Sequence, residues 1–192
     1  MTGPLADAES RLQELGVVPF AVPLGKLAPV VAGGFNGMKR GDWIVAGPRE
    51  RVGAVLRGCP PERLVHAYAG AKPYKVAPAS QAPGTRALHA VGLALTDHSP
   101  VLCFLGMASA ASGSFGEALN VAALTGAPVV FLVTVQRLDD SAPVGRQLAA
   151  SPAAIAEAHG IKAIRIAGAS ADAIASAVSE CRGSQALIEV VL

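Results

Sequence analysis

The residues best placed to do chemistry lie in a loop that begins at Gly106, between two strand-like segments. Residues 101–105 and 129–133 are short apolar runs, and between them apolar side chains recur at the spacing of a helix. This pattern predicts two parallel strands joined by a crossover helix. A loop at the carboxyl end of such a strand meets the unpaired N–H groups of the following helix. Its position therefore favours binding of an anion such as phosphate.

Several side chains near this loop invite a catalytic interpretation, and each also has a structural one. Ser109, Ser112 and Ser114 lack the flanking glycines of a nucleophile elbow. Ser114 and Glu117 have the spacing of a capping box, in which the serine bonds to the helix start and the glutamate reaches back. Met107 is interpreted as a flexible side chain that fills a buried gap, rather than as a redox or ligand residue. We therefore predict no catalytic residue in this segment.

Two arginines, Arg49 and Arg51, precede a predicted helix and leave two interpretations open. They either bind an anion such as phosphate or form the solvated start of that helix. Gly33, Gly34 and Gly37 partly match the glycine spacing of a dinucleotide fingerprint. Because no strand clearly leads into them, we assign no nucleotide to this segment.

Composition indicates a globular protein with a large apolar surface to bury. Of 192 residues, 52% are hydrophobic and 16% are charged, and the mean hydropathy is +0.44. This charge content is low for a soluble monomer, so we expect apolar surface to be buried against a partner. The net charge of +2 comes without a basic cluster, so nucleic acid is not an expected partner. No apolar run is long enough to span a membrane, so no membrane association is expected.

The three cysteines lie far apart in the sequence and lack the spacing of metal ligands. Cys103 lies in a strand-like run and Cys181 on the apolar face of a predicted helix, so buried, reduced thiols are predicted. The four histidines are dispersed and are interpreted as surface or packing residues. Unpaired cysteines and the lack of a signal peptide pattern at the amino end predict a cytoplasmic protein.

The remaining segments alternate between helices and strands that must position the Gly106 loop. The amino end predicts an amphipathic helix, and residues 17–40, rich in proline and glycine, give no clear pattern. Gly41-Asp42 is a turn signal, and residues 43–46 are predicted to form a short extended piece. Further helices are predicted at 49–58 and 61–70, and from residue 85 onward helices and strands alternate, with Ser151 and Ser170 as helix caps. This order predicts a three-layer α/β/α fold with a mostly parallel sheet. We expect one domain, with 1–24 as an amino-terminal helix and lead-in and 25–192 as the core.

Several segments, taken in order, resemble the alpha subunit of thiamine-diphosphate-dependent 2-oxo acid dehydrogenases of the pyruvate and branched-chain types. The run Phe115-Gly116-Glu117-Ala118-Leu119-Asn120 resembles the family's Phe-x-Glu-Ala-Leu-Asn, and Pro48-Arg49-Glu50-Arg51 resembles its Tyr-Arg-x-His segment. Gly41-Asp42-Trp43-Ile44 and Leu187-Ile188-Glu189 resemble two further segments. The resemblance covers residues 25–192 of a shortened core. It implies a thiamine-diphosphate-binding fold.

The resemblance fails at the positions where the family binds its cofactor. There, the aspartate of a Gly-Asp-Gly motif and an asparagine of an Asn-Asn pair hold magnesium, which holds the cofactor diphosphate. The matching positions here are Gly106-Met107-Ala108 and Val135-Gln136. Magnesium prefers oxygen ligands, so a thioether is a poor substitute and a valine side chain offers nothing. In the segment that contacts the phosphates only Arg49 is kept, and Arg51 stands where the family has histidine.

The resemblance leaves three hypotheses for the function. We favour a noncatalytic homologue of the alpha subunit that has lost thiamine diphosphate and magnesium and acts as a structural or regulatory assembly subunit. The first alternative is an alpha-like component of an active 2-oxo acid dehydrogenase with a separate beta subunit, which would need thiamine diphosphate and magnesium. The second is a module that binds an anion or another small ligand at the Gly106 loop. We expect no enzymatic activity from the chain on its own.

The assembly hypothesis places subunit contacts on the helix that starts near Phe115, a region that the family uses at its interfaces. Small side chains along this helix would allow close approach of a partner backbone. The interface candidates are Phe115, Gly116, Leu119, Asn120 and Ala123. We expect either a homo-oligomer or a complex with a dehydrogenase beta-subunit-like protein.

Overall fold

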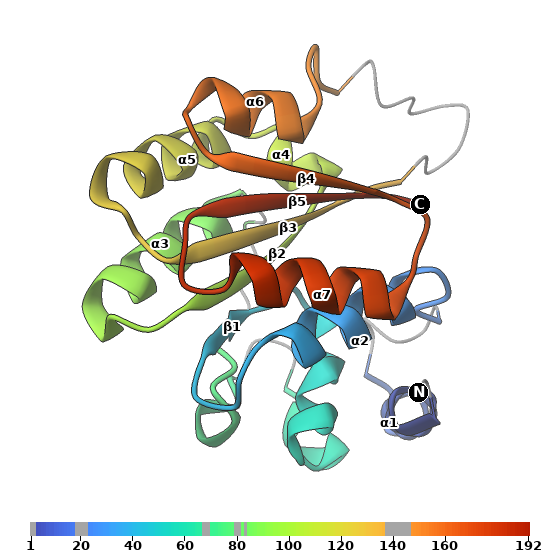
Figure 1. The fold of residues 1–192 in the computed structure, drawn as a ribbon. Coiled ribbons are helices and arrows are strands. Elements are labelled where there is room, and N and C mark those ends of the chain that lie inside the picture. Colours follow the sequence, from blue (N-terminus) through green and yellow to red (C-terminus); the bar gives the residue numbers. More distant parts are fainter. Residues whose placement is uncertain (1–2, 18–22, 67–69, 79–81, 83, 137–146) are drawn as a thin grey trace.

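Five apolar segments form one parallel sheet in a computed structural model, which describes residues 3–17, 23–66, 70–78, 82, 84–136 and 147–192. The strand order is β1-β2-β3-β5-β4, and every neighbouring pair is parallel (Figure 1). The strands are β1 (Trp43–Val45), β2 (Val101–Gly106), β3 (Val129–Val135), β4 (Lys162–Ala167) and β5 (Ala186–Val191). The predicted α/β architecture with a parallel sheet is confirmed.

The middle strands are buried on both faces, which explains their continuous apolar sequences. Strands β2 and β3 pair in register from Val101 opposite Val129 to Gly106 opposite Thr134, so both strands end at the same level. Strand β4 lies at an edge, and its residues are exposed or half-buried. The carboxyl ends of the strands therefore form one common rim.

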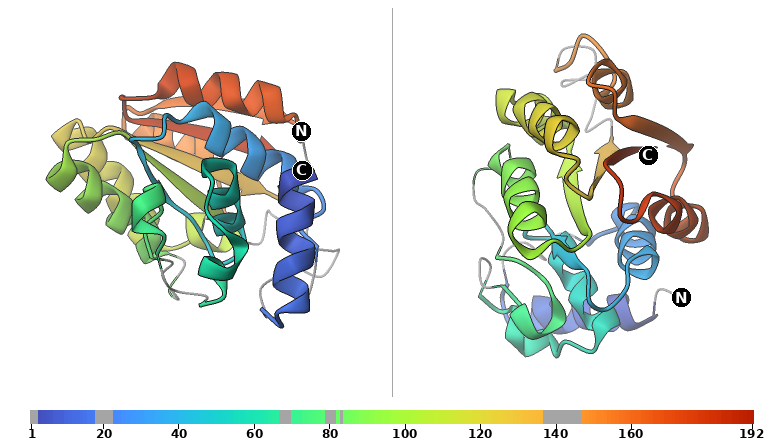
Figure 2. Two further views of the ribbon diagram at one scale, coloured as in Figure 1. Left: turned by 90° about the horizontal axis from the view of Figure 1, so that it is seen from below. Right: turned by 60° about the vertical axis from the view of Figure 1, so that its left-hand side comes forward.

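The direction of each crossover decides which face a helix covers. Steps from β1 to β2, β2 to β3 and β3 to β4 run one way across the sheet, and the step from β4 to β5 runs back. Because such crossovers are right-handed, the last helix must lie on the opposite face. Helices α3 (Thr85–Asp97), α5 (Gly113–Thr125) and α6 (Pro152–Ala158) indeed share one face, while α7 (Ala171–Cys181) packs with α2 (Leu27–Gly37) on the other (Figure 2).

Shorter and peripheral helices complete the two layers. Helix α1 (Gly3–Glu14) buries Leu5 and Leu12 in the core cluster on the α2/α7 face, as its amphipathic pattern predicts. The predicted helix 49–58 is the 3-10 helix η2 (Glu50–Arg57), which ends at the left-handed Gly58. The prediction for 61–70 was too long, because only η3 (Pro61–Leu64) forms and residues 67–69 lie outside the described residues. The other short helices are η4 (Lys72–Tyr74) and α4 (Met107–Ala110). Among the described helices, none has the length and apolar character that a bilayer span requires.

The proline- and glycine-rich segment that gave no clear pattern contains helix α2. Pro29 lies in its first turn, where the missing N–H costs little. Gly33 and Gly37 face α7, and Gly34 faces the ring of Phe104 in the sheet. These glycines therefore serve close packing of helix on helix and helix on sheet.

Two of the three predicted helix caps are confirmed. The hydroxyl oxygens of Ser151 and Ser170 accept hydrogen bonds from backbone N–H groups in the first turns of α6 and α7. The predicted capping box at Ser114 and Glu117 is wrong, because α5 begins at Gly113 and its N-cap residue is Ser112. The Ser112 hydroxyl donates to the carbonyl of Ser109 instead of capping the helix.

All three cysteines are buried and unpaired, and we expect them to be inert in the folded protein. Burial raises the pKa of the Cys59 and Cys181 thiols and raises that of Cys103 to about 12. Because the thiolate is the reactive form, Ellman's reagent at mildly alkaline pH should find no fast-reacting thiol in the native protein and three after denaturation. A thiol that reacts rapidly before unfolding would contradict this packing.

Candidate functional site

The chain leaves the carboxyl ends of β1 and β2 toward opposite faces of the sheet. After β1, η2 buries Val52 on the α2/α7 face, whereas after β2, α5 buries Phe115 and Leu119 on the other face. Such a divergence opens a crevice in which open α/β sheets usually bind ligands. A pocket of about 280 Å³ lies here, and we call it the β1/β2 pocket. Its lining residues are Leu27, Arg49, Glu50, Gly106, Met107, Ala108, Thr134, Gln136 and Gln147.

Five of the seven positions that the sequence singled out for a cofactor site gather in the β1/β2 pocket. They are Arg49, Gly106, Met107, Ala108 and Gln136, and they come from three separate segments of the chain. The extended Gly106 ends β2 and places Met107 as the first residue of α4. Met107 is 6% exposed, in agreement with its interpretation as a side chain that fills a gap.

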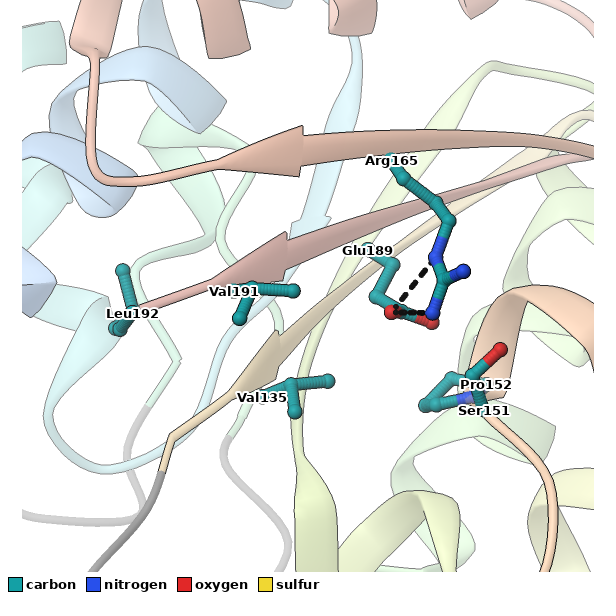
Figure 3. A pocket seen from close by; sticks show the side chains of 7 residues that line it. All are labelled: Val135, Ser151, Pro152, Arg165, Glu189, Val191 and Leu192. Atoms are coloured by element: carbon teal, nitrogen blue, oxygen red, sulfur yellow. Dashed lines mark hydrogen bonds and ion pairs between the residues drawn. The ribbon is translucent and has the colours of Figure 1, made fainter.

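The other two predicted positions, Arg51 and Val135, do not line the β1/β2 pocket, so their assignment to this site is corrected. Arg51 is 2% exposed and donates to the backbone carbonyls of Pro48, Leu64 and His66. It is therefore neither a solvated helix start nor an anion ligand of the pocket, because its guanidinium joins two chain segments. The side chain of Val135 lines a different pocket, beside β5 (Figure 3).

Glu50 is a pocket residue that sequence reasoning missed. Its carboxylate lies beside the guanidinium of the buried Arg86, and a Cβ at Gly47 would collide with both, at 2.7 Å from Arg86 Nη1. Arg86 Nη1 also donates to the Phe104 carbonyl, and its Nε has no hydrogen-bond partner in the described part of the chain. The only signal for Glu50 was its place next to Arg49. A charged residue at a helix start is normally expected to be exposed to solvent, so the sequence offered no reason to place Glu50 in a pocket.

The polar groups of the β1/β2 pocket have mixed charge and few free oxygens. Arg49 brings a positive charge, although its Nη2 already donates to the Pro23 carbonyl at 2.6 Å. The Thr134 hydroxyl donates to the Leu105 carbonyl at 3.2 Å. The side chains of Gln136 and Gln147 are uncharged amides. Within residues 3–17, 23–66, 70–78, 82, 84–136 and 147–192, no group of three His, Cys, Asp or Glu residues could hold a metal ion.

The interface candidates on α5 divide between core and surface. Phe115 and Leu119 are at most 1% exposed and pack beneath the helix, so the interface assignment of these two is corrected. Their hydrophobicity serves the contact with the sheet, where Phe115 meets Phe131 edge-on. Asn120 is exposed, and Gly116 and Ala123 are half-buried. Of the five interface candidates, these three remain accessible on the outer side of α5.

The sequence of this chain matches that of a known protein family. The family model described as "Dehydrogenase E1 component" matches residues 29–185. Two curated relatives, named 3-methyl-2-oxobutanoate dehydrogenase subunit alpha, come from Mycobacterium tuberculosis strains CDC 1551 / Oshkosh and ATCC 25618 / H37Rv. Each is 33% identical in an alignment of 171 residues that covers 82% of this chain and 47% of the relative. The chain thus spans about half the length of these relatives.

Two solved structures with the same fold are transketolases. The enzyme from Campylobacter jejuni subsp. jejuni NCTC 11168 superposes with a TM-score of 0.72 at 16% identity, over 99% of this chain and 36% of that chain. An H261F mutant from Pichia stipitis gives a TM-score of 0.65 at 16% identity, over 86% and 31% of the two chains. Both likenesses concern the fold alone.

Proposed function

Because the chain belongs to the dehydrogenase E1 component family, we propose that it is a noncatalytic relative of the alpha subunit, which binds neither thiamine diphosphate nor magnesium. It acts as a structural or regulatory assembly subunit, either with itself or with a beta-subunit-like protein. The observation that carries this proposal is the donor set of the β1/β2 pocket. Met107, whose thioether is a poor magnesium ligand, lines this pocket, and the resemblance matches it to the family's magnesium-binding aspartate.

The electrostatics of the β1/β2 pocket also fit a metal-bound diphosphate poorly. Magnesium prefers several oxygen ligands in octahedral geometry, and the two pocket positions that match the family's metal ligands offer a thioether from Met107 and one amide oxygen from Gln136. Without the metal, the Glu50 carboxylate would repel a diphosphate that Arg49 alone attracts. The residues present therefore do not fit the cofactor of the family, and no catalytic step is assigned to this chain.

The test is calorimetric titration of the purified protein with thiamine diphosphate and magnesium, with the solution mass measured on the same sample. We expect no saturable heat and a defined oligomer. Saturable, magnesium-dependent heat would overturn the proposal. It would favour an alpha-like component of an active dehydrogenase, for which the retained pocket with Arg49 and Gln136 is the supporting observation.

Restoring the missing oxygens should restore magnesium-dependent binding if their loss is the cause. We expect the double variant Met107→Asp, Gln136→Asn to show saturable heat with thiamine diphosphate only when magnesium is present, since it regains a carboxylate and a short amide in one pocket. The matched control Met107→Asn, Gln136→Asn has nearly the same shape without the charge and should stay silent. Equal binding by both variants would show that the carboxylate is irrelevant.

A small-ligand module is a second candidate, since the lining of the β1/β2 pocket includes two amides, the positive charge of Arg49 and several apolar side chains. It predicts that an anion such as inorganic phosphate protects the native protein against heat without magnesium. Loss of that protection in Arg49→Met would support this candidate, and equal protection of the variant would count against it.

A further inference from the structure

A second pocket lies at the same rim of the sheet, on the far side of β3 from the β1/β2 pocket. We call it the β5 pocket, and its volume is about 300 Å³, at the lower end of the range for small-molecule sites of roughly 300 to 1,000 Å³. It lies where the chain leaves β3 toward the α6 face and β4 toward the α7 face. This is again a point of divergence at strand carboxyl ends, where ligands are expected. The pocket is lined by Val135, Ser151, Pro152, Arg165, Glu189, Val191 and Leu192 (Figure 3).

The polar end of the β5 pocket is a fixed ion pair. Glu189 is 1% exposed, and its Oε1 accepts from Arg165 Nε at 3.1 Å and from Nη2 at 2.9 Å. Its Oε2 accepts from the backbone N–H of Ala153 at 2.8 Å. The buried carboxylate and the exposed guanidinium thus neutralise each other, and three donors already occupy the carboxylate. Glu189 therefore holds Arg165 in place and has little capacity left for a ligand.

The polar end of the β5 pocket has more hydrogen-bond donors than acceptors. Arg165 uses Nε and one N–H of Nη2 for Glu189, and its Nη1 makes no hydrogen bond to any described residue. The Arg165 side chain is 62% exposed, so this free side of the guanidinium is open to a ligand. The Ser151 oxygen accepts from Ala154, which leaves its own O–H to donate. A ligand here must bring hydrogen-bond acceptors, and a carboxylate matches the planar guanidinium best.

The remaining wall is aliphatic. Val135, Val191 and Leu192 surround the other end of the pocket (Figure 3). Val191 is 43% exposed, which is unusual for a large apolar side chain of this protein. Covering these side chains with a hydrocarbon group would remove apolar surface from water.

We propose that the β5 pocket binds a short aliphatic carboxylate, with its carboxyl group on Arg165 and Ser151 and its hydrocarbon tail against Val135, Val191 and Leu192. The donors at the polar end of the pocket match the carboxylate of this ligand, and the aliphatic wall matches its hydrocarbon tail. An amine would meet only donors and the positive Arg165 at the polar end. A small inorganic anion would leave the aliphatic wall uncovered. This site is independent of the β1/β2 pocket and of the function proposed for it.

The test is an NMR titration of the isotope-labelled full chain with 3-methylbutanoate, following the resonances of the pocket residues. We expect saturable shifts confined to the β5 pocket, and binding at least about tenfold weaker for 3-methylbutanamide, which has the same shape without the charge. Acetate, which lacks the tail, should also bind more weakly. Absence of shifts at tens of millimolar, or equal binding of the acid and the amide, would overturn the proposal.

Variants separate the two halves of the site. Arg165→Met should weaken binding of the acid by about tenfold or more and leave the amide unaffected. The matched control is Lys162→Met, which removes a cation from the same strand outside the pocket and should bind as wild type. Val191→Asp keeps the Arg165–Glu189 pair, so a loss of binding in this variant cannot be attributed to an unpaired Glu189. Unchanged affinity in Arg165→Met or in Val191→Asp would refute the site.

Discussion

Replacing Gly33 by alanine is expected to destabilise the protein by about 2 kcal/mol, because an added methyl group has no space between α2 and α7. A Cβ at this position would lie 2.6 Å from the Ala171 carbonyl oxygen and 2.7 Å from the Ile174 Cβ. Neither atom lies at the flexible end of a side chain, so the two helices would have to separate. Overpacking of this kind costs roughly 1 to 3 kcal/mol or more, against a gain of about 1 kcal/mol for alanine over glycine in a helix.

The matched control for this prediction is Gly92→Ala in α3. Gly92 is also a helical glycine, but a Cβ added there would have nothing within 4 Å, so only the gain in helix stability applies. The two variants should therefore differ in sign when urea or thermal unfolding is measured. For a chain of this size, a loss of about 2 kcal/mol lowers Tm by roughly 4 to 8 °C. Equal stabilities of the two variants would show that α2 and α7 are not in close contact.

Helix α2 shows where sequence reasoning fails for this fold. Its segment combines a proline with three glycines, residues of low helix propensity, so local preference argues against a helix. The helix exists because packing on α7 and the sheet outweighs that preference, and the partner residues lie far along the chain. The strands β2, β3 and β5 could be predicted, because a strand buried on both faces produces an uninterrupted apolar run.

The candidate site could also be predicted only in part. The residues around Gly106 and Gln136 could be assigned to one place, because the carboxyl ends of neighbouring parallel strands meet at one rim. The sequence could not predict that Arg49 lines the β1/β2 pocket while Arg51 is buried elsewhere, since both residues follow the same strand. The Arg51 guanidinium donates to the carbonyls of Leu64 and His66, whose positions depend on the path of the chain beyond η2. Side-chain direction at the end of β3 likewise decided that Val135 and Gln136 enter different pockets.

Replacing Asp42 by alanine is expected to cost about 3 to 5 kcal/mol, the largest loss among the predicted variants, because it removes the counter-charge of two arginines. Asp42 is 2% exposed and accepts from Arg182 Nε at 2.7 Å and Nη2 at 2.6 Å. This bond raises the pKa of Arg182. Nearby, the buried Arg57 donates to the backbone carbonyls of Asp42, Lys39 and Tyr74.

Arg57 gives the Asp42 prediction a pH signature. The pKa of Arg57 is lowered to about 10, chiefly by burial; the negative charge of Asp42 opposes this shift, and the positive charge of Arg40 adds to it. An arginine whose pKa is lower in the folded than in the unfolded state makes stability rise with pH, since the unfolded chain binds more protons. Without Asp42 the pKa of Arg57 should fall further. The charged guanidinium then costs more at neutral pH, and the folded protein loses its proton sooner as the pH rises.

The stability gap between Asp42→Ala and wild type should therefore narrow as the pH is raised from neutrality toward 10, which urea unfolding at a series of pH values can measure. The control is Glu180→Ala, which breaks the exposed ion pair with Lys162 and should leave stability near that of wild type at every pH. Asp42→Asn separates charge from shape, because the amide keeps one acceptor oxygen for Lys39 or Arg182. A large loss in the alanine variant with little loss in the asparagine variant would mean that hydrogen bonding, and not charge, holds this cluster together. If the stability difference between Asp42→Ala and wild type stayed constant with pH, Arg57 would not be coupled electrostatically to Asp42.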